Sequence, residues 1–144
     1  MKKVISGVLL LIVLGIAGYY WTHQTDAQGT SFKTVSVQEA ERELQKDPEI
    51  VLIDVRTPME FYGPSGHVNK ALLRPVQNIS NWVNEIQNLK DKKLMIICQS
   101  GGRSYMASKY LSEHGFRRII NVDGGMTAWN IAGLPAVHEK APTN

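Results

Sequence analysis

The stretch that decides the fold is Leu94-Met95-Ile96-Ile97-Cys98-Gln99-Ser100-Gly101-Gly102-Arg103-Ser104. It joins a short apolar run, typical of a buried strand, to a glycine-rich loop that holds the only cysteine of the chain. Residues 105–114 then follow a helical pattern, so a helix N-terminus and the N–H groups of the loop point toward the sulfur. Such a position and a neighbouring arginine both lower the pKa of a cysteine thiol from its usual value of about 8.5. The stretch therefore predicts an anion-binding cradle around a thiolate, in which the same donors could hold an oxyanion.

The length and composition of the chain predict one folded domain. Its 144 residues are typical of one domain and leave little room for a second. The 43% of residues that are hydrophobic are enough to form the core of that domain. The formal charge of +3 includes Lys2 and Lys3, and the other basic residues are interleaved with acidic ones. We interpret the basic clusters at 90–93 and 117–118 as solvated ends of elements, and we expect no nucleic-acid surface.

The N-terminus has the pattern of an export signal. Two lysines precede an apolar stretch, residues 4–20, and the next charge is Asp26. As a helix these 17 residues rise about 26 Å, slightly less than the hydrocarbon core of a bilayer, which is about 30 Å thick. The small residues of Thr25-Asp26-Ala27 favour a cleaved signal peptide, whereas the length of the stretch and the aromatic Tyr19-Tyr20-Trp21 favour an uncleaved anchor. In both cases the rest of the chain is expected on the outer side of the membrane.

This interpretation divides the chain and places its domain outside the cytoplasm. We expect residues 1–27 to be the signal peptide or signal anchor, with a transmembrane helix at about 4–21 if it is uncleaved. Residues 28–34 read as a polar linker, residues 32–137 as the folded domain and residues 138–144 as a C-terminal tail. Because the N-terminal lysines stay on the cytoplasmic side, the domain is expected to be periplasmic or outward-facing and anchored to the inner membrane. In that compartment a single cysteine is a free or intermolecularly paired thiol.

Apolar runs and helical patterns alternate along the domain. Ser36 and Glu39 match a capping box at the start of a helix that ends at Asp47-Pro48. Further helices are expected at residues 80–89, 103–114 and 126–132, and strands at residues 50–53, 71–73, 94–97 and 119–122. Such alternation is typical of an α/β domain around a mostly parallel sheet.

Polar side chains follow each of the predicted strands. They are Asp54, Arg74, Cys98 and Asp123. Because ligands of open α/β sheets bind beyond the carboxyl ends of the strands, we expect these residues to gather at one edge of the sheet. The sequence therefore predicts a site at the edge that holds Cys98.

Several stretches share a characteristic order and spacing. They are Leu52-Ile53-Asp54-Val55-Arg56 with Glu60-Phe61, then Gly66-His67-Val68 with Ala71, then the loop 98–104, then Asn121-Val122-Asp123-Gly124-Gly125-Met126-Thr127-Ala128-Trp129 with Ala132-Gly133-Leu134-Pro135. Together they resemble the rhodanese homology domain over about residues 32–137. The resemblance implies a rhodanese-like α/β fold with a mostly parallel five-stranded sheet flanked by helices on both faces. It also implies that Cys98 accepts a sulfane sulfur as a persulfide and passes it on, with no metal and no organic cofactor.

The resemblance points to further residues around the catalytic Cys98. The substrate would be held by the loop residues Gln99, Ser100, Gly101, Gly102, Arg103 and Ser104, whose N–H groups would also stabilise the thiolate and the persulfide. Arg103 is expected either to add positive charge or to tie the loop to the domain. Asp54 and Arg56 match the strand-end pair of the family, and we expect them to brace the loop and the neighbouring turn.

The length of the loop favours sulfur transfer over phosphate chemistry. Four residues lie between Cys98 and Arg103, one fewer than in related cysteine phosphatases, which leaves room for a sulfur atom. We therefore predict a thiosulfate sulfurtransferase in which Cys98 attacks a small sulfur-containing donor and passes the sulfur to a thiol, to a cyanide-like acceptor or to an acceptor protein. The alternative is an exported sulfur-carrier or redox-sensing module with little turnover, and a minor one is arsenate or phosphate chemistry.

Two residues depart from the pattern of the family. Gln99 stands where many members place arginine or another charged residue. Because its side chain is neutral, the positive potential at the site is lower, which favours a protein or low-molecular-weight persulfide as donor. Arg74 replaces the apolar residue expected before Pro75, and we expect it either to add a positive charge at the mouth of the site, where it would bind thiosulfate, or to face solvent. We interpret His67 as structural, because an ionised thiol needs no general base. The core is expected to include Trp82, Trp129, Met95, Met106 and Met126.

Overall fold

A five-stranded, wholly parallel sheet forms the centre of the domain, as predicted. The computed structural model describes residues 32–142. The strands are β1 (Lys33–Val35), β2 (Val51–Asp54), β3 (Leu72–Leu73), β4 (Leu94–Ile97) and β5 (Ile119–Val122). Their order across the sheet is β1-β5-β4-β2-β3, which puts β4 in the middle and the Cys98 loop at its carboxyl end.

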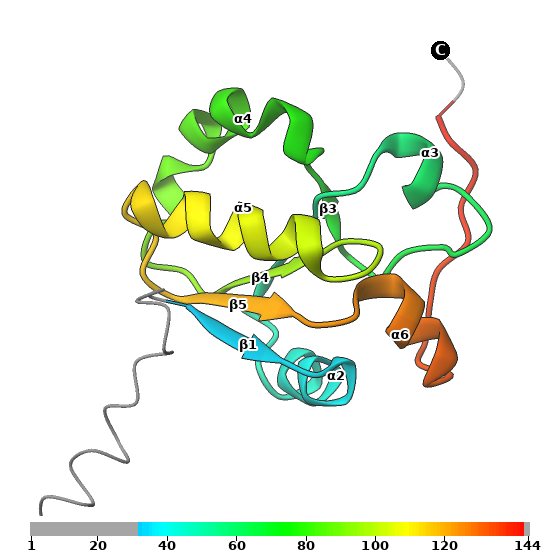
Figure 1. The fold of residues 1–144 in the computed structure, drawn as a ribbon. Coiled ribbons are helices and arrows are strands. Elements are labelled where there is room, and N and C mark those ends of the chain that lie inside the picture. Colours follow the sequence, from blue (N-terminus) through cyan, green and yellow to red (C-terminus); the bar gives the residue numbers. More distant parts are fainter. Residues whose placement is uncertain (1–31, 143–144) are drawn as a thin grey trace, which may run out of the picture. The chain divides into compact units, whose positions relative to one another are not determined.

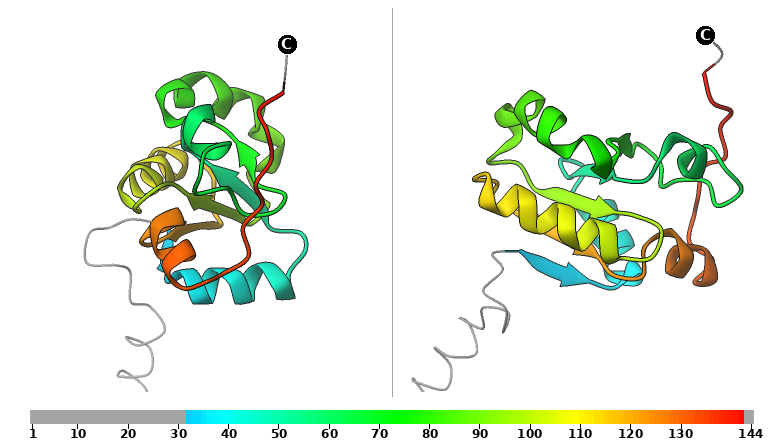
Figure 2. Two further views of the ribbon diagram at one scale, coloured as in Figure 1. Left: turned by 90° about the vertical axis from the view of Figure 1, so that its right-hand side faces the viewer. Right: turned by 45° about the horizontal axis from the view of Figure 1, so that its top comes forward.

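Helices cover both faces of this sheet (Figure 1). They are α2 (Val37–Lys46), α3 (Pro58–Phe61), α4 (Ile79–Glu85), α5 (Gly102–Glu113) and α6 (Gly125–Ile131), with short 3-10 turns η1 (Val76–Asn78) and η2 (Gln87–Leu89). α4 and α5 lie on one face, and α2 and α6 lie on the other, an arrangement that the two views of Figure 2 also show. The layers are those predicted for a rhodanese-like fold.

The central strand β4 is buried along its whole length. Leu94, Ile96 and Cys98 pack in the apolar cluster that includes side chains of α4 and α5. Met95 and Ile97 pack in the second cluster, with side chains of α2 and α6. Because both faces are covered, the strand needs a continuous apolar run instead of an alternating one. The alternation of faces brings Cys98 to the α5 side.

The predicted elements are present, several of them with shifted ends, and three elements were not predicted. The helix expected at 80–89 is divided into α4 and η2, while β1, α3 and the 3-10 turn η1 have no counterpart among the predictions. β1 is only three residues long, and α3 only four, so neither is long enough for a periodic pattern. Trp82 and Trp129 are buried as expected, but Met106 is 61% exposed, so its placement in the core was wrong.

The capping box expected at α2 is only half formed. The hydroxyl of Ser36 accepts from the N–H of Glu39 at 3.3 Å, which satisfies one free donor of the first turn. The carboxylate of Glu39 does not return to Ser36, because it accepts from the ammonium of Lys33 in β1 at 2.6 Å. The complete capping box of this domain is at α3, between Thr57 and Glu60.

The predictions for the N-terminus lie outside the described residues. They concern the signal peptide or anchor at 1–27 and the transmembrane helix at about 4–21. Within residues 32–142, no helix has the length and apolar character needed to cross a bilayer.

We expect the substitution Ile96→Ala to lower the free energy of unfolding by about 3 kcal/mol, because it leaves a cavity at a fully buried position of β4. The matched control is Ile131→Ala, at a side chain that is 83% exposed, where the change should stay within about 0.5 kcal/mol. Urea unfolding of both variants measures the difference. Equal losses in the two variants would contradict the assignment of β4 to the core.

Candidate functional site

The polar residues that follow the strands gather at the carboxyl edge of the sheet, as predicted. Asp54 ends β2, Cys98 follows β4 and Asp123 follows β5. The N–H of Arg74 donates to the carbonyl oxygen of Asp54 at 2.8 Å. A Cβ atom placed on Gly101 would lie 3.3 Å from the carboxylate of Asp123. In Figure 1 the loop between β4 and α5 lies between α3 and α6 at this edge.

Cys98 is fully buried at the start of this loop, and donors surround its sulfur. The backbone N–H of Gly101 donates to Sγ at 3.1 Å. Burial raises the pKa of the thiol, but the Ser104 side chain and the N–H groups of Ser104, Ser100 and Gly101 outweigh it, so the pKa lies below its usual value. The lower pKa increases the fraction of thiolate, which is the nucleophilic form of cysteine.

The direction of the loop is set by the first turn of α6. The N–H of Met126 donates to the carbonyl oxygen of Cys98 at 2.8 Å, and the N–H of Thr127 donates to that of Gln99 at 2.9 Å. Gly125 has φ of 55° and lies against the Cys98 carbonyl so closely that a Cβ atom would overlap its oxygen. Because the first carbonyls of the loop are bound by α6, the N–H groups that follow are free to turn toward the sulfur.

Arg103 ties the loop to α3. Its guanidinium donates to both carboxylate oxygens of Glu60, at 2.8 and 2.5 Å. These hydrogen bonds, together with those from the N–H and hydroxyl of Thr57, lower the pKa of Glu60 to about 2 against the opposing effect of burial. Of the two roles predicted for Arg103, this geometry corresponds to the tie between loop and domain.

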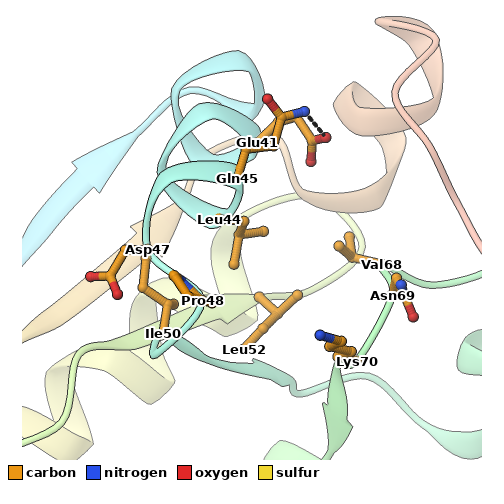
Figure 3. Close-up of a pocket in the computed structure, with 10 residues that line it drawn as sticks. All are labelled: Glu41, Leu44, Gln45, Asp47, Pro48, Ile50, Leu52, Val68, Asn69 and Lys70. Atoms are coloured by element: carbon orange, nitrogen blue, oxygen red, sulfur yellow. Dashed lines mark hydrogen bonds between the residues drawn. The ribbon is translucent and has the colours of Figure 1, made fainter.

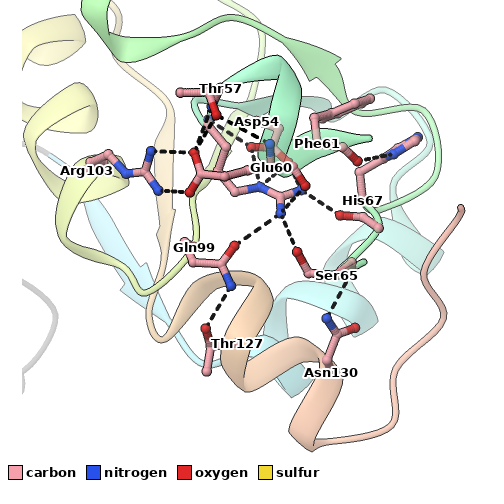
Figure 4. A network of polar contacts seen from close by, with 12 residues as sticks. Asp54, Thr57, Glu60, Phe61, Ser65, His67, Gln99, Arg103, Thr127 and Asn130 are labelled. Carbon is pink, nitrogen blue, oxygen red and sulfur yellow. Dashed lines mark hydrogen bonds and ion pairs between the residues drawn. The ribbon is translucent and has the colours of Figure 1, made fainter. Parts of the chain in front are cut away.

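Arg56 and Asp54 form an ion pair with no exposed surface on either side chain. Arg56 donates from Nη2 to Oδ2 of Asp54 at 2.7 Å and from Nε to both carboxylate oxygens at 3.0 Å. Its remaining donors bind the carbonyl oxygens of Gly66 and Glu60 and the side chains of Ser65 and Gln99 (Figure 4). Removing one partner of a buried pair leaves an uncompensated charge, so this pair is a structural support of the loop.

Gln99 links that buried support to α6. Its side-chain oxygen accepts from Nη1 of Arg56 at 3.2 Å, and its Nε2 donates to the hydroxyl of Thr127 at 3.0 Å (Figure 4). The residue after the thiol therefore uses both ends of its amide to hold the loop in place. Ser100 and Gly102 form the exposed side of the loop.

Two other candidates contact groups away from Cys98. Arg74 is paired with Glu85 of α4 at 3.8 Å and donates to the carbonyl of Leu73, so its role in binding thiosulfate stays a prediction. His67 is buried, stacks on Phe61 and is hydrogen-bonded through Nδ1 to the Phe61 carbonyl, a structural position.

A separate hollow is drawn in Figure 3. Its apolar floor is formed by Leu44, Ile50, Leu52 and Val68, between α2 and the loop 68–70. None of the ten residues that line it belongs to the Cys98 loop, so it is a different feature from the site.

Two residues that support the loop were not predicted from the sequence. Glu60 binds Arg103, and Thr127 binds Gln99. A signal for Glu60 was present, because Thr57-Pro58-Met59-Glu60 has the capping-box spacing with proline at the first helical position. No local pattern identifies Thr127, since its partner is 28 residues earlier in the chain.

The chain is similar to known proteins over the region that contains the site. The pattern that defines the Rhodanese-like domain family matches residues 36–132. A protein of Allochromatium vinosum named sulfurtransferase is 40% identical over 89 residues, which are 62% of this chain and 79% of that protein. A putative sulfurtransferase of Bacillus subtilis is 36% identical over 97 residues, covering 67% of this chain and 89% of that protein.

Solved structures give the same result for the fold. A rhodanese-related protein from Thermoplasma volcanium matches with a TM-score of 0.65 and 26% identity, over 74% of this chain and 99% of that one. A rhodanese-like domain protein from Staphylococcus aureus matches with a TM-score of 0.62 and 30% identity, over 73% of this chain and 98% of that one.

The ion pair between Glu60 and Arg103 gives a prediction for stability against pH. Because the pKa of Glu60 is lowered on folding from 4.5 to about 2, its contribution is complete above about pH 4.5 and is lost as the pH falls toward 2. The substitution Glu60→Gln should therefore cost about 1 kcal/mol at pH 6, allowing for solvent screening of a partly exposed pair, and less at pH 3. Urea unfolding at both pH values measures this.

The control for this experiment is Glu49→Gln, whose carboxylate is 76% exposed and pairs only with Lys92 among the described residues. It should change the free energy of unfolding little at either pH. A cost of Glu60→Gln that is the same at pH 6 and pH 3 would contradict the proposed contribution of its charge.

Proposed function

The chain belongs to the Rhodanese-like domain family and is a rhodanese-type sulfurtransferase or sulfur carrier; from this premise we propose that it transfers sulfane sulfur, from a donor such as thiosulfate to a thiophilic acceptor, through a persulfide on Cys98. The observation that carries the proposal is the setting of Cys98. Its buried sulfur accepts the Gly101 N–H, and the pKa of the thiol is lowered by the donors of the loop.

In the first step the Cys98 thiolate attacks the outer sulfur of the donor. With thiosulfate, a bond forms between Sγ and the sulfane sulfur, the sulfur–sulfur bond of the donor breaks, and its electron pair leaves with sulfite. A thiolate and a dianion thus become a persulfide anion and sulfite dianion, and no external oxidant or reductant is needed. The fixed N–H donors keep Cys98 in its thiolate form before the attack and hold the negative charge of the persulfide after it.

In the second step the acceptor removes the outer sulfur and restores the thiolate. A cyanide ion would leave as thiocyanate, and a thiolate acceptor, small or on a protein, would leave as its persulfide. Transfer through a covalent intermediate predicts ping-pong kinetics. Both forms of the enzyme carry one negative charge at the sulfur, so the same donors serve both.

The size of the loop supports sulfur over phosphate as the transferred group. Four residues separate Cys98 from Arg103, and both ends of this short loop are held, by α6 and by Glu60. A loop fixed in this way has little freedom to widen around a phosphate. A sulfur atom added to Sγ is the smaller group.

We expect the full-length protein, incubated with thiosulfate, to gain the mass of one sulfur atom, about 32 Da, and to lose it as thiocyanate when cyanide is added. Cys98→Ser should show neither change, because the only nucleophilic sulfur is removed. Intact-protein mass spectrometry and a thiocyanate assay measure the two steps.

The outcomes of this experiment separate the candidate functions. Repeated cycles of thiosulfate consumption and thiocyanate release support the sulfurtransferase. Loading of one sulfur atom on Cys98 with no repeated cycles favours the carrier. Failure of every sulfane donor to load wild-type protein, or equal turnover by Cys98→Ser, would contradict the proposal.

We also propose, from the sequence of residues 1–27, that the domain is exported and held at the inner membrane by an anchor at about 4–21. The protein should then fractionate with membranes with an intact N-terminus, and protease added to spheroplasts should digest the domain. N-terminal sequencing that begins at Gln28 would contradict the anchor, and a domain protected from protease in intact spheroplasts would contradict export.

A further inference from the structure

We infer that the site selects sulfur donors of low negative charge, and that the carboxylate of Asp123 is the residue that sets this preference. The inference rests on the proposed function, because it concerns the donor of the same Cys98 site. It follows from the charges placed around the loop and from how each one is paired. The class of donor it favours is a thiol persulfide over the thiosulfate dianion.

The cations next to the loop are already neutralised. Arg103 is bound by both oxygens of Glu60, at 2.8 and 2.5 Å, and Arg56 is buried against Asp54 at 2.7 Å. The charge of each arginine is therefore already balanced by a carboxylate and is not available to attract an anionic donor. The positive potential at Sγ comes from peptide N–H groups and the start of α5, which carry partial charges only.

Gln99 adds no charge to this balance. Its amide is held between Arg56 and Thr127, at 3.2 and 3.0 Å, in the position next to the thiol. A neutral group that is already hydrogen-bonded at both ends leaves no free cation on this side of the loop. The structure therefore shows that the neutral Gln99, expected from the sequence to lower the positive potential, is held in the position directly after Cys98.

Asp123 adds a negative charge beside the loop, next to Gly101. Its carboxylate would lie 3.3 Å from a Cβ atom on Gly101, the residue whose N–H donates to Sγ. Asp123 is exposed, and no ion pair within residues 32–142 neutralises it. With the other charges cancelled in pairs, this carboxylate gives the surroundings of the thiol a net negative charge.

This charge affects the two classes of donor differently. Thiosulfate brings two negative charges, and sulfite leaves with two. With a thiol persulfide, RSSH, a bond forms between Sγ and the outer sulfur, the sulfur–sulfur bond of the donor breaks, and its electron pair leaves with RS⁻, which carries one charge. The proton stays on the transferred sulfur and is released to solvent when the persulfide on Cys98 ionises. Thiosulfate carries both charges from the moment it approaches, whereas RSSH approaches uncharged and places one charge on its leaving group only as the bond breaks. Repulsion by Asp123 therefore opposes the reaction of thiosulfate more than twice as strongly.

The test compares kcat/KM for thiosulfate and for cysteine persulfide, using the full-length protein in mild detergent with cyanide as the acceptor. Asp123→Asn should raise kcat/KM for thiosulfate about five- to tenfold, and that for cysteine persulfide less than about twofold, because only the charge is removed. Asp123→Glu keeps the charge and should leave the ratio unchanged. Glu49→Gln, which removes an exposed carboxylate from the turn before β2, should also leave it unchanged.

A salt titration gives a second measurement that does not depend on a variant. For wild-type protein, kcat/KM for thiosulfate should rise with added sodium chloride, because salt screens repulsion, and that for cysteine persulfide should change less. If Asp123→Asn fails to fold, this titration decides the question. A ratio unmoved by Asp123→Asn, or a thiosulfate rate that falls with salt, would overturn the role of Asp123. Absence of sulfur on Cys98 with both donors would instead overturn the proposed function.

Discussion

The site depends on two hydrogen bonds that turn the reactive loop. The N–H groups of Met126 and Thr127 bind the carbonyl oxygens of Cys98 and Gln99, so the loop cannot present those oxygens to the sulfur. The contact is possible because β5 lies beside β4, which brings α6 to the end of β4, and because Gly125 has no side chain. Strand order, a glycine and a short helix thus produce a cradle of N–H donors from main-chain atoms.

The charged residues of the site act mainly as supports. Arg56 and Asp54 have no exposed surface, and their pairing organises the turn at Gly66 as well as Gln99. Arg103 uses its guanidinium to bind Glu60 of α3. A buried or paired charge is specific in geometry but contributes little net field. The structure therefore separates two tasks, since ion pairs hold the loop while peptide groups stabilise the sulfur.

The sequence predicted those parts of the molecule that have local patterns. The apolar run before Cys98, the glycines and the helix after it gave the central strand, the loop and α5. β1 was missed because three residues, Lys33–Val35, carry no period, and its place is set by pairing with β5. The role of Arg103 stayed open between two alternatives because Glu60 is 43 residues away in sequence. Long-range pairing of this kind depends on the finished fold, which no spacing within one segment contains.

The charge of the proposed intermediate explains why main-chain donors suit this chemistry. A thiolate and a persulfide anion on Cys98 carry the same charge, so the cradle meets nearly the same electrostatic demand before and after the sulfur is transferred. A strong fixed cation would hold both forms and would give no advantage to either step, because only interactions that differ between ground state and transition state change the rate. The charge that varies is that of the donor. Selectivity is therefore expected from groups at the rim of the loop, such as Gln99 and Asp123, and not from the donors that bind the sulfur itself.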